Sequence, residues 1–460
     1  MNKFLWGNST SSMQTEGAYK EGGKGPSVYD IREANADKSD WKVAIDEYHR
    51  YEEDINLMSE MGMNCYRFQI SRSRIFPEGE GKVNEEGLKF YENLIDTLIK
   101  YDIEPMICLY HFDMPLALYK KYDGFSSRQV TKEFVKYGKL IVDRFHEKVK
   151  YWITFNEHNL YPMDMGFMIG GSKKEHNLEN IYNIQHYTLL AHAKIANYIH
   201  DNYEDLQIGG MLAYSPYYPA SSNPDDVLLA DQYDRFLNKL YLDVFSGRSY
   251  PRFFLNYLDK NRINIDINKE DLEEFDKLYS DFMSFSYYQS QTVKANGEEF
   301  NTLKLNQIID NVYLDRSEWN WEIDPVGLRI SMENIFADGN VPVFIIENGI
   351  GLREELSEDE FIEDDQRIDY HDRHIKQMKE AMRDGVDCIG YLGWGLIDIL
   401  SSSGDMNKRY GAVYVNRDNH DLKDLRRIKK KSFDFFKTVF KQNLLEEIWY
   451  DWNWWKKLSR

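Results

Sequence analysis

The sequence predicts a single α/β domain over residues 1–460, folded as a (β/α)₈ TIM barrel with extended loops after its strands. Eight short apolar or β-branched runs recur along the chain, and most are continuous rather than alternating in apolar character, as buried parallel strands are. Helical periodicity lies between them, which favours successive βαβ units. The eight runs are residues 4–12, 64–71, 104–112, 149–157, 207–215, 281–288, 341–349 and 388–398.

Three of the connecting segments have a clear amphipathic pattern. Residues 86–101 repeat Leu88, Tyr91, Leu94, Ile95 and Leu98 on one helical face, and 130–145 and 368–382 follow the same rule. A barrel needs only about 250 residues, and the surplus falls mainly in the connections after the fourth, fifth and sixth runs. A doubly wound open sheet is the alternative architecture.

Composition narrows the classes of function. The net charge is −20, from 57 basic and 77 acidic residues, which argues against a nucleic-acid partner. No window of 18 apolar residues and no signal-peptide pattern occurs, so we expect no membrane partner and a cytoplasmic location. The three cysteines are far apart and outside any Cys/His cluster, which predicts reduced thiols, no metal and no cofactor.

Glu347 raises the first question about function. It ends an apolar run and precedes Asn348–Gly349, a pair typical of a hairpin turn. A barrel strand, however, must leave toward a helix, and active sites of barrels gather at the carboxyl ends of the strands. Glu157 ends the fourth run in the same way; its alternative role is to cap the next helix.

Two carboxylates on opposite strands of one barrel mouth suit the cleavage of a glycosidic bond. In a retaining mechanism one attacks the anomeric carbon, while the other protonates the leaving oxygen and later activates water. Further polar or aromatic groups end or lie in neighbouring runs, and together they suit a hydroxyl-rich ligand, although each alone is compatible with a structural role: Gln14, Arg67, His111, Asn156, Tyr287 and Trp394.

Several motifs in order over some 400 residues resemble family 1 glycoside hydrolases. They are FLWGNSTSSMQTEGAYKEGGKGPSVYD, DEYHRYEEDINLMSEMGMNCYRFQIS, LYHFDMP, TFNEHN, SFSYY, WEIDPVGLR, FIIENG and YLGWGLIDILSSSGDMNKRYGAVYV. The resemblance implies a (β/α)₈ barrel and retaining β-glycosidase activity, with Glu347 as nucleophile and Glu157 as acid/base.

The resemblance also implies roles for the surrounding residues. Gln14, His111 and Asn156 would hold sugar hydroxyls, and Trp394 would lie under the sugar ring. Arg67 and Tyr287 would orient the nucleophile. A cation and a hydroxyl donor there would keep Glu347 ionised, and its charge would raise the pKa of Glu157.

The loop SSSGDMNKRY, residues 401–410, decides between substrates. β-Glucosidases of the family carry Glu and then Trp where this chain has Ser401 and Ser402. The loop is similar to the 6-phospho-β-glucosidase branch, which implies that Ser401, Lys408 and Tyr410 bind a 6-phosphate. A phosphate dianion favours a cation and neutral donors over a carboxylate.

Other functions remain open at this point. The absence of Trp at position 402 favours 6-phospho-β-glucosides, and the alternatives are an unphosphorylated β-glucoside or β-galactoside, a 6-phosphogalactoside, or a non-catalytic phosphosugar-binding role. The family's ISWSR reads ISRSR here, so Arg72 either alters the pocket or adds a cation for phosphate. The aromatic tail, 443–460, is expected to pack on the barrel. The sequence does not predict the oligomeric state.

Overall fold

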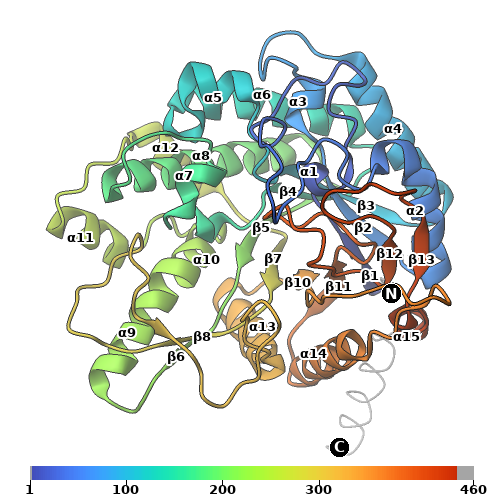
Figure 1. The fold of residues 1–460 in the computed structure, drawn as a ribbon. Coiled ribbons are helices and arrows are strands. Elements are labelled where there is room, and N and C mark those ends of the chain that lie inside the picture. Colours follow the sequence, from blue (N-terminus) through green and yellow to red (C-terminus); the bar gives the residue numbers. More distant parts are fainter. Residues whose placement is uncertain (1–2, 443–460) are drawn as a thin grey trace, which may run out of the picture.

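The computed structural model describes residues 3–442, and its centre is a closed barrel of eight parallel strands (Figure 1). β1 pairs with both β2 and β11, so the barrel closes and the open-sheet alternative is wrong. The order around the barrel is β1-β11-β10-β7-β5-β4-β3-β2. The strands are β1 Leu5–Ser9, β2 Cys65–Gln69, β3 Glu104–Tyr110, β4 Tyr151–Phe155, β5 Gln207–Ala213, β7 Phe282–Tyr287, β10 Val343–Asn348 and β11 Cys388–Trp394.

Each of the eight apolar runs contains one barrel strand, which confirms the predicted fold. The strands are buried on both faces because side chains alternate between the barrel interior and the surrounding helices. A small interior cluster fills the barrel: Leu5, Cys65, Met106, Cys108, Tyr151, Ile153, Met211, Phe282, Phe344, Ile346 and Leu392. The larger core lies between the strands and the helices.

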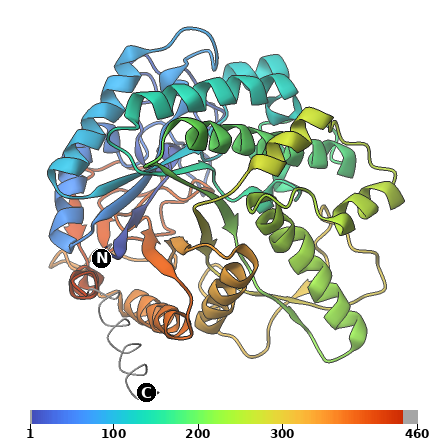
Figure 2. The ribbon, with the colours of Figure 1, turned by 180° about the vertical axis from the view of Figure 1, so that it is seen from behind.

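The helices form a layer around the strands, as Figures 1 and 2 show from opposite sides. The three helices expected from periodicity are present, and the predicted apolar face of α4 is buried. The main helices of this layer are α2 Glu47–Met61, α4 Glu85–Lys100, α6 Arg128–Phe145, α8 Leu178–Asn202, α13 Pro325–Gly339, α14 Asp365–Arg383 and α15 Lys431–Val439.

The extra length lies in the connections after β4, β5 and β7, as expected. Three short strands from two of them form a separate sheet in the order β6-β8-β9, which Figure 1 places with α9 beside the barrel. The connections after β5 and β7 contain the following elements: β6 Tyr217–Pro219, α9 Pro224–Asp234, a π-helical turn Arg235–Lys239, α10 Leu240–Phe245, α11 Arg252–Lys260, α12 Lys269–Lys277, β8 Gln291–Val293 and β9 Ile308–Ile309.

Short elements complete the connections, among them a two-stranded ladder formed by the last two strands. No helix within residues 3–442 is long and apolar enough to span a lipid bilayer. The tail 443–460 lies outside the described residues, and the single-domain organisation stays a prediction. The short elements are α1 Ser12–Thr15, α3 Arg72–Ile75, α5 Leu116–Tyr122, α7 Met165–Ile169, β12 Val413–Val415, β13 Arg427–Lys429 and the 3₁₀ turns Gly124–Ser126 and His158–Leu160.

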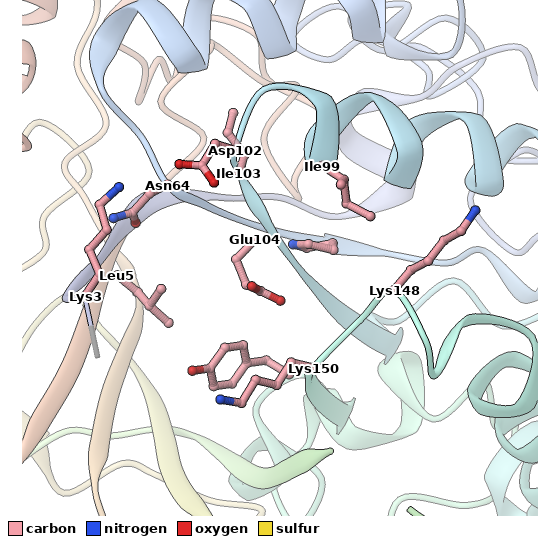
Figure 3. A pocket seen from close by; sticks show the side chains of 11 residues that line it. Lys3, Leu5, Asn64, Ile99, Asp102, Ile103, Glu104, Lys148 and Lys150 are labelled. Atoms are coloured by element: carbon pink, nitrogen blue, oxygen red, sulfur yellow. The ribbon is translucent and has the colours of Figure 1, made fainter. Parts of the chain in front are cut away.

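A hollow of about 310 Å³ opens at the amino ends of the first strands (Figure 3). Glu104 and Tyr151, which line it, are the first residues of β3 and β4. Catalytic residues of such barrels lie at the opposite, carboxyl end. This hollow is therefore distinct from the candidate active site.

Candidate active site

A β-bulge turns Glu347 into the barrel. Side chains alternate along a strand, and Ile345 packs in the outer core with the helices, so regular alternation would turn Glu347 outward too. The register between β10 and β7 shifts between Ile345 and Glu347. The inserted residue, Ile346, belongs to the barrel interior. The bulge thus re-aims the carboxylate, and Glu347 is only 2% exposed.

Arg67, on β2, is the ion-pair partner of Glu347. Its side chain is fully buried, and Nη1 donates to Oε1 of Glu347 over 2.8 Å. Nη2 donates to Oδ1 of Asn156 over 2.7 Å. The predicted orienting role of Arg67 agrees with this geometry, because a guanidinium only donates and so favours the ionised carboxylate.

The tyrosine that contacts Glu347 is Tyr288, which corrects the prediction for Tyr287. The Tyr288 hydroxyl donates to Oε2 of Glu347 over 2.9 Å. The Tyr287 hydroxyl instead donates to the backbone oxygen of Asp324, in the outer core. Strand alternation explains the difference, since Phe282 lies in the barrel interior and even-numbered positions of β7 share its face. The sequence shows the alternation but not which face of β7 points into the barrel.

Glu157 lies two residues after the end of β4 and adopts a left-handed backbone conformation, with φ of 47°. A non-glycine residue there carries strain of a kind that gathers at functional sites. Its side chain forms no capping hydrogen bond to the next helical turn, so the capping alternative is wrong. The Ser286 hydroxyl donates to Oε1 of Glu157 over 2.5 Å, a contact that the sequence did not indicate.

Burial raises the pKa of both glutamates. It raises the pKa of Glu347 to about 8, a rise that Arg67 opposes and the Glu157 charge increases. It also raises the pKa of Glu157, and here burial, rather than the Glu347 charge, is the leading cause. The hydrogen bonds that Arg67 and Tyr288 donate to Glu347 oppose the rise in its pKa, because both favour its charged form.

Most of the predicted sugar-binding residues lie around this pair. The amide oxygen of Asn156 is held by Arg67, while its Nδ2 has no hydrogen-bond partner among residues 3–442. The buried Nδ1 of His111 is likewise unpartnered there, and its ring centroid lies 5.5 Å from that of Trp394. Burial and the Arg67 charge hold the pKa of His111 well below 6.5, so its imidazole is neutral.

Gln14 differs from these residues in having a protein partner for its amide nitrogen, which donates to the backbone oxygen of Leu400 over 2.7 Å.

The loop after β11 brings Ser401, Lys408 and Tyr410 to the same end of the barrel. Ser401 directly follows Leu400, the partner of Gln14, and its hydroxyl lies 3.0 Å from that of Ser403. Tyr410 is buried, and its pKa is raised by burial and by the charges of Glu347 and Glu157. Of these three predicted residues, Tyr410 feels the charges of both glutamates, and the ammonium of Lys408 lies 5.6 Å from the Tyr410 ring centroid.

A cavity of about 180 Å³ borders the pair. Its lining includes Ser286 and Tyr288, which bond the two glutamates, and the apolar side chains of Leu160, Met163 and Trp321. Within residues 3–442, no group of three or more His, Cys, Asp or Glu side chains is arranged to hold a metal ion.

The Arg72 side chain is buried against a backbone oxygen and two aromatic rings. Its Nε donates to the backbone oxygen of Gly79 over 2.9 Å, and its guanidinium lies 6.0 Å and 5.8 Å from the ring centroids of Phe134 and Tyr137 on α6. No carboxylate pairs with it in the part of the chain that is described. Burial lowers the pKa of Arg72 to about 10.

A closed parallel barrel with two glutamates at its carboxyl end, Glu347 buried and Glu157 half-buried, is the architecture of a glycoside hydrolase. A comparison with family models identifies the family: residues 1–445 match the model for glycosyl hydrolase family 1. The chain belongs to this family and is a glycoside hydrolase enzyme.

Individual relatives agree with this assignment. The chain is 39% identical to the aryl-phospho-beta-D-glucosidase BglC of Bacillus subtilis, covering 96% of this chain and 97% of the relative. It is 40% identical, with the same coverage, to a phospho-cellobiase of Klebsiella oxytoca. Among solved structures, a beta-glucosidase from Thermotoga maritima in complex with glucoimidazole superposes with a TM-score of 0.86 at 31% identity, over 96% of this chain and 99% of that one.

We expect Tyr288→Phe to shift the acidic limb of the pH profile of kcat/KM upward by about one unit and to lower its maximum about 10-fold or more. In the wild type, the hydrogen bond from the Tyr288 hydroxyl favours the charged form of Glu347. Removing it raises the pKa of that carboxyl. The pH dependence of glycoside hydrolysis measures both effects. Tyr287→Phe is the matched control and should leave the acidic limb in place; equal shifts in both variants would contradict the assignment.

Arg72→Met should change the free energy of unfolding by no more than about 1 kcal/mol and activity by less than twofold. A buried cation without a carboxylate partner is replaceable by an apolar side chain of similar volume. The neighbouring Arg74→Met should instead cost about 3–5 kcal/mol, because Arg74 bonds the buried Glu16 over 2.6 Å. Denaturant unfolding measures both. A large loss of activity in Arg72→Met would show that Arg72 acts on the substrate.

Proposed function

We propose that this enzyme hydrolyses 6-phospho-β-D-glucosides, such as phosphorylated β-linked disaccharides or aryl β-glucosides, to glucose 6-phosphate and the aglycone, with retention of configuration. The observation that carries the proposal is a buried lysine, Lys408, which has no carboxylate partner among residues 3–442 and whose ammonium lies 5.6 Å from the ring centroid of Tyr410. The relatives named as acting on phosphorylated glucosides support the same substrate class.

In this proposal Glu347 is the nucleophile and Glu157 the acid/base. Arg67 and Tyr288 keep Glu347 ionised until it attacks the anomeric carbon. Glu157 gives its proton to the leaving oxygen. Once the glycosyl ester forms, Glu157 has lost its proton to the leaving oxygen and can take a proton from the attacking water.

The sugar is held by donors and a ring face near the pair. The unpartnered Nδ2 of Asn156 donates to a sugar hydroxyl, and neutral His111 bonds another. Trp394 offers its indole face to the apolar side of the ring. Gln14 is bonded to Leu400, so its role is to fix the start of the 401–410 loop as well as to approach the sugar.

The phosphate lies at that loop in the proposal, on Ser401, Lys408 and Tyr410. A local cation is needed there because the chain carries a net charge of −20, which repels an anionic substrate at long range. Sugar phosphates are intracellular metabolites, so a cytoplasmic location belongs to this proposal.

The experiment that tests the proposal compares p-nitrophenyl β-glucoside with its 6-phosphate. We expect kcat/KM to be about 100-fold or more higher for the phosphorylated substrate, since charge-assisted hydrogen bonds to phosphate each contribute about 1.5–3 kcal/mol. Glu347→Gln should abolish turnover of both. Preference for the unphosphorylated glucoside would overturn the phosphate assignment, and turnover by the Gln variant would overturn the nucleophile.

Affinity for glucose 6-phosphate should fall as pH rises above about 8. Burial lowers the pKa of Lys408 to about 8, so its ammonium is charged below that pH and neutral above it, while the phosphate is a dianion above about pH 6. The inhibition constant should rise by up to about tenfold per pH unit above 8. Lys408→Met should bind weakly and lack this dependence; a wild-type profile that stays flat to pH 9.5 would contradict a role for Lys408.

A further inference from the structure

Lys408 is buried in an unusual way for a lysine. Within residues 3–442, Lys408 and Lys430 are the lysines that the structure buries, at 8% and 2% exposure. Lys430 pairs with Glu354 and Asp398 over 2.5 Å and 2.9 Å. Lys408 has no such pair in the same part of the chain, although burying an unpaired charge is costly.

An aromatic face takes the place of the missing carboxylate. Nζ of Lys408 lies 3.6 Å from the ring centroid of Trp321 and 5.5 Å from that of Trp319. At such distances the negative face of an indole attracts a cation. Both tryptophans lie in the connection between β9 and α13, far from Lys408 in sequence.

The stem of Lys408 is confined on its other side by Gly351. A Cβ placed on Gly351 would lie 2.6 Å from Cγ and 2.9 Å from Cε of Lys408. The close approach follows from the backbone bridge between Leu352 and Arg409, which brings the two segments together. Lys408 is thus held between a glycine backbone and an indole face.

We propose that Trp321 and Gly351 position Lys408, so that its ammonium is kept in place and unpaired for the 6-phosphate of the substrate. A carboxylate in the position of Trp321 would neutralise the lysine and repel the phosphate. The neutral indole stabilises the cation without either effect. This inference rests on the proposed phosphate site and adds specificity-determining residues that do not touch the phosphate.

The test is competitive inhibition by glucose 6-phosphate and by glucose at pH 7. Neither inhibitor has an aglycone, so contacts of Trp321 with the cavity next to it do not enter the measurement. We expect Trp321→Leu to weaken glucose 6-phosphate about 5- to 20-fold, the size of a partly desolvated cation–π contact, and to leave glucose unchanged. Trp321→Phe, which retains an aromatic face, should recover much of the loss.

A double-mutant cycle with Lys408→Met separates a positioning role from direct contact. In the Lys408→Met background, Trp321→Leu should cause no further loss. An equal loss in both backgrounds would show that Trp321 acts on the ligand itself and would overturn the inference. If Lys408→Met weakens glucose 6-phosphate but Trp321→Leu does not, the phosphate site stands and the positioning role fails. If Lys408→Met has no effect, both fail.

Gly351→Ala provides a second route that leaves the indole in place. The new methyl group must displace the lysine stem, so this variant should also weaken glucose 6-phosphate severalfold while glucose binding and the circular dichroism spectrum are retained. Unchanged inhibition by glucose 6-phosphate would overturn the role of Gly351. Should Trp321→Leu fail to fold, Gly351→Ala in the two Lys408 backgrounds decides the inference.

Discussion

The buried guanidinium of Arg67 is the interaction on which the site depends. It donates to Ser9 at the end of β1, to Glu347 on β10 and to Asn156 just beyond β4. An arginine has no acceptor and does not lose its proton in proteins, so every group around it must accept. That one requirement draws residues from four strands toward a common point, fixes the amide orientation of Asn156 and favours the charged form of Glu347.

The Arg67 cation also lowers the pKa of Glu347, which burial alone would raise further. Burial raises the pKa of both glutamates of the site, and at Glu347 the Arg67 charge and the Tyr288 hydrogen bond oppose that rise. The contrast with the other buried cations is informative. Arg72 and Lys408 both lack a carboxylate partner among residues 3–442. Arg72 contacts a backbone oxygen and two rings of α6, whereas Lys408 lies against the indole of Trp321.

The sequence predicted the eight strands, three helices and the two glutamates because those features depend on local pattern. Apolar runs and helical periodicity are short-range signals, and barrel topology places strand ends together. It failed at Tyr287, because the apolar run did not show which face of β7 points into the barrel and Tyr288 is the residue that bonds Glu347. It also could not reveal that Ser286 contacts Glu157, because that contact joins residues 129 positions apart.

By itself the sequence determined the barrel, the ends of strands at which the polar groups gather, and the absence of a carboxylate at Ser401. The direction of the side chains was decided only by the tertiary structure. A one-residue bulge in β10 turns Glu347 inward, and Lys408 meets Trp321 and Gly351 from distant segments. A one-residue shift of register reverses the face of every following side chain, and long-range contacts leave no periodic trace in the chain, so neither feature could be read from local pattern.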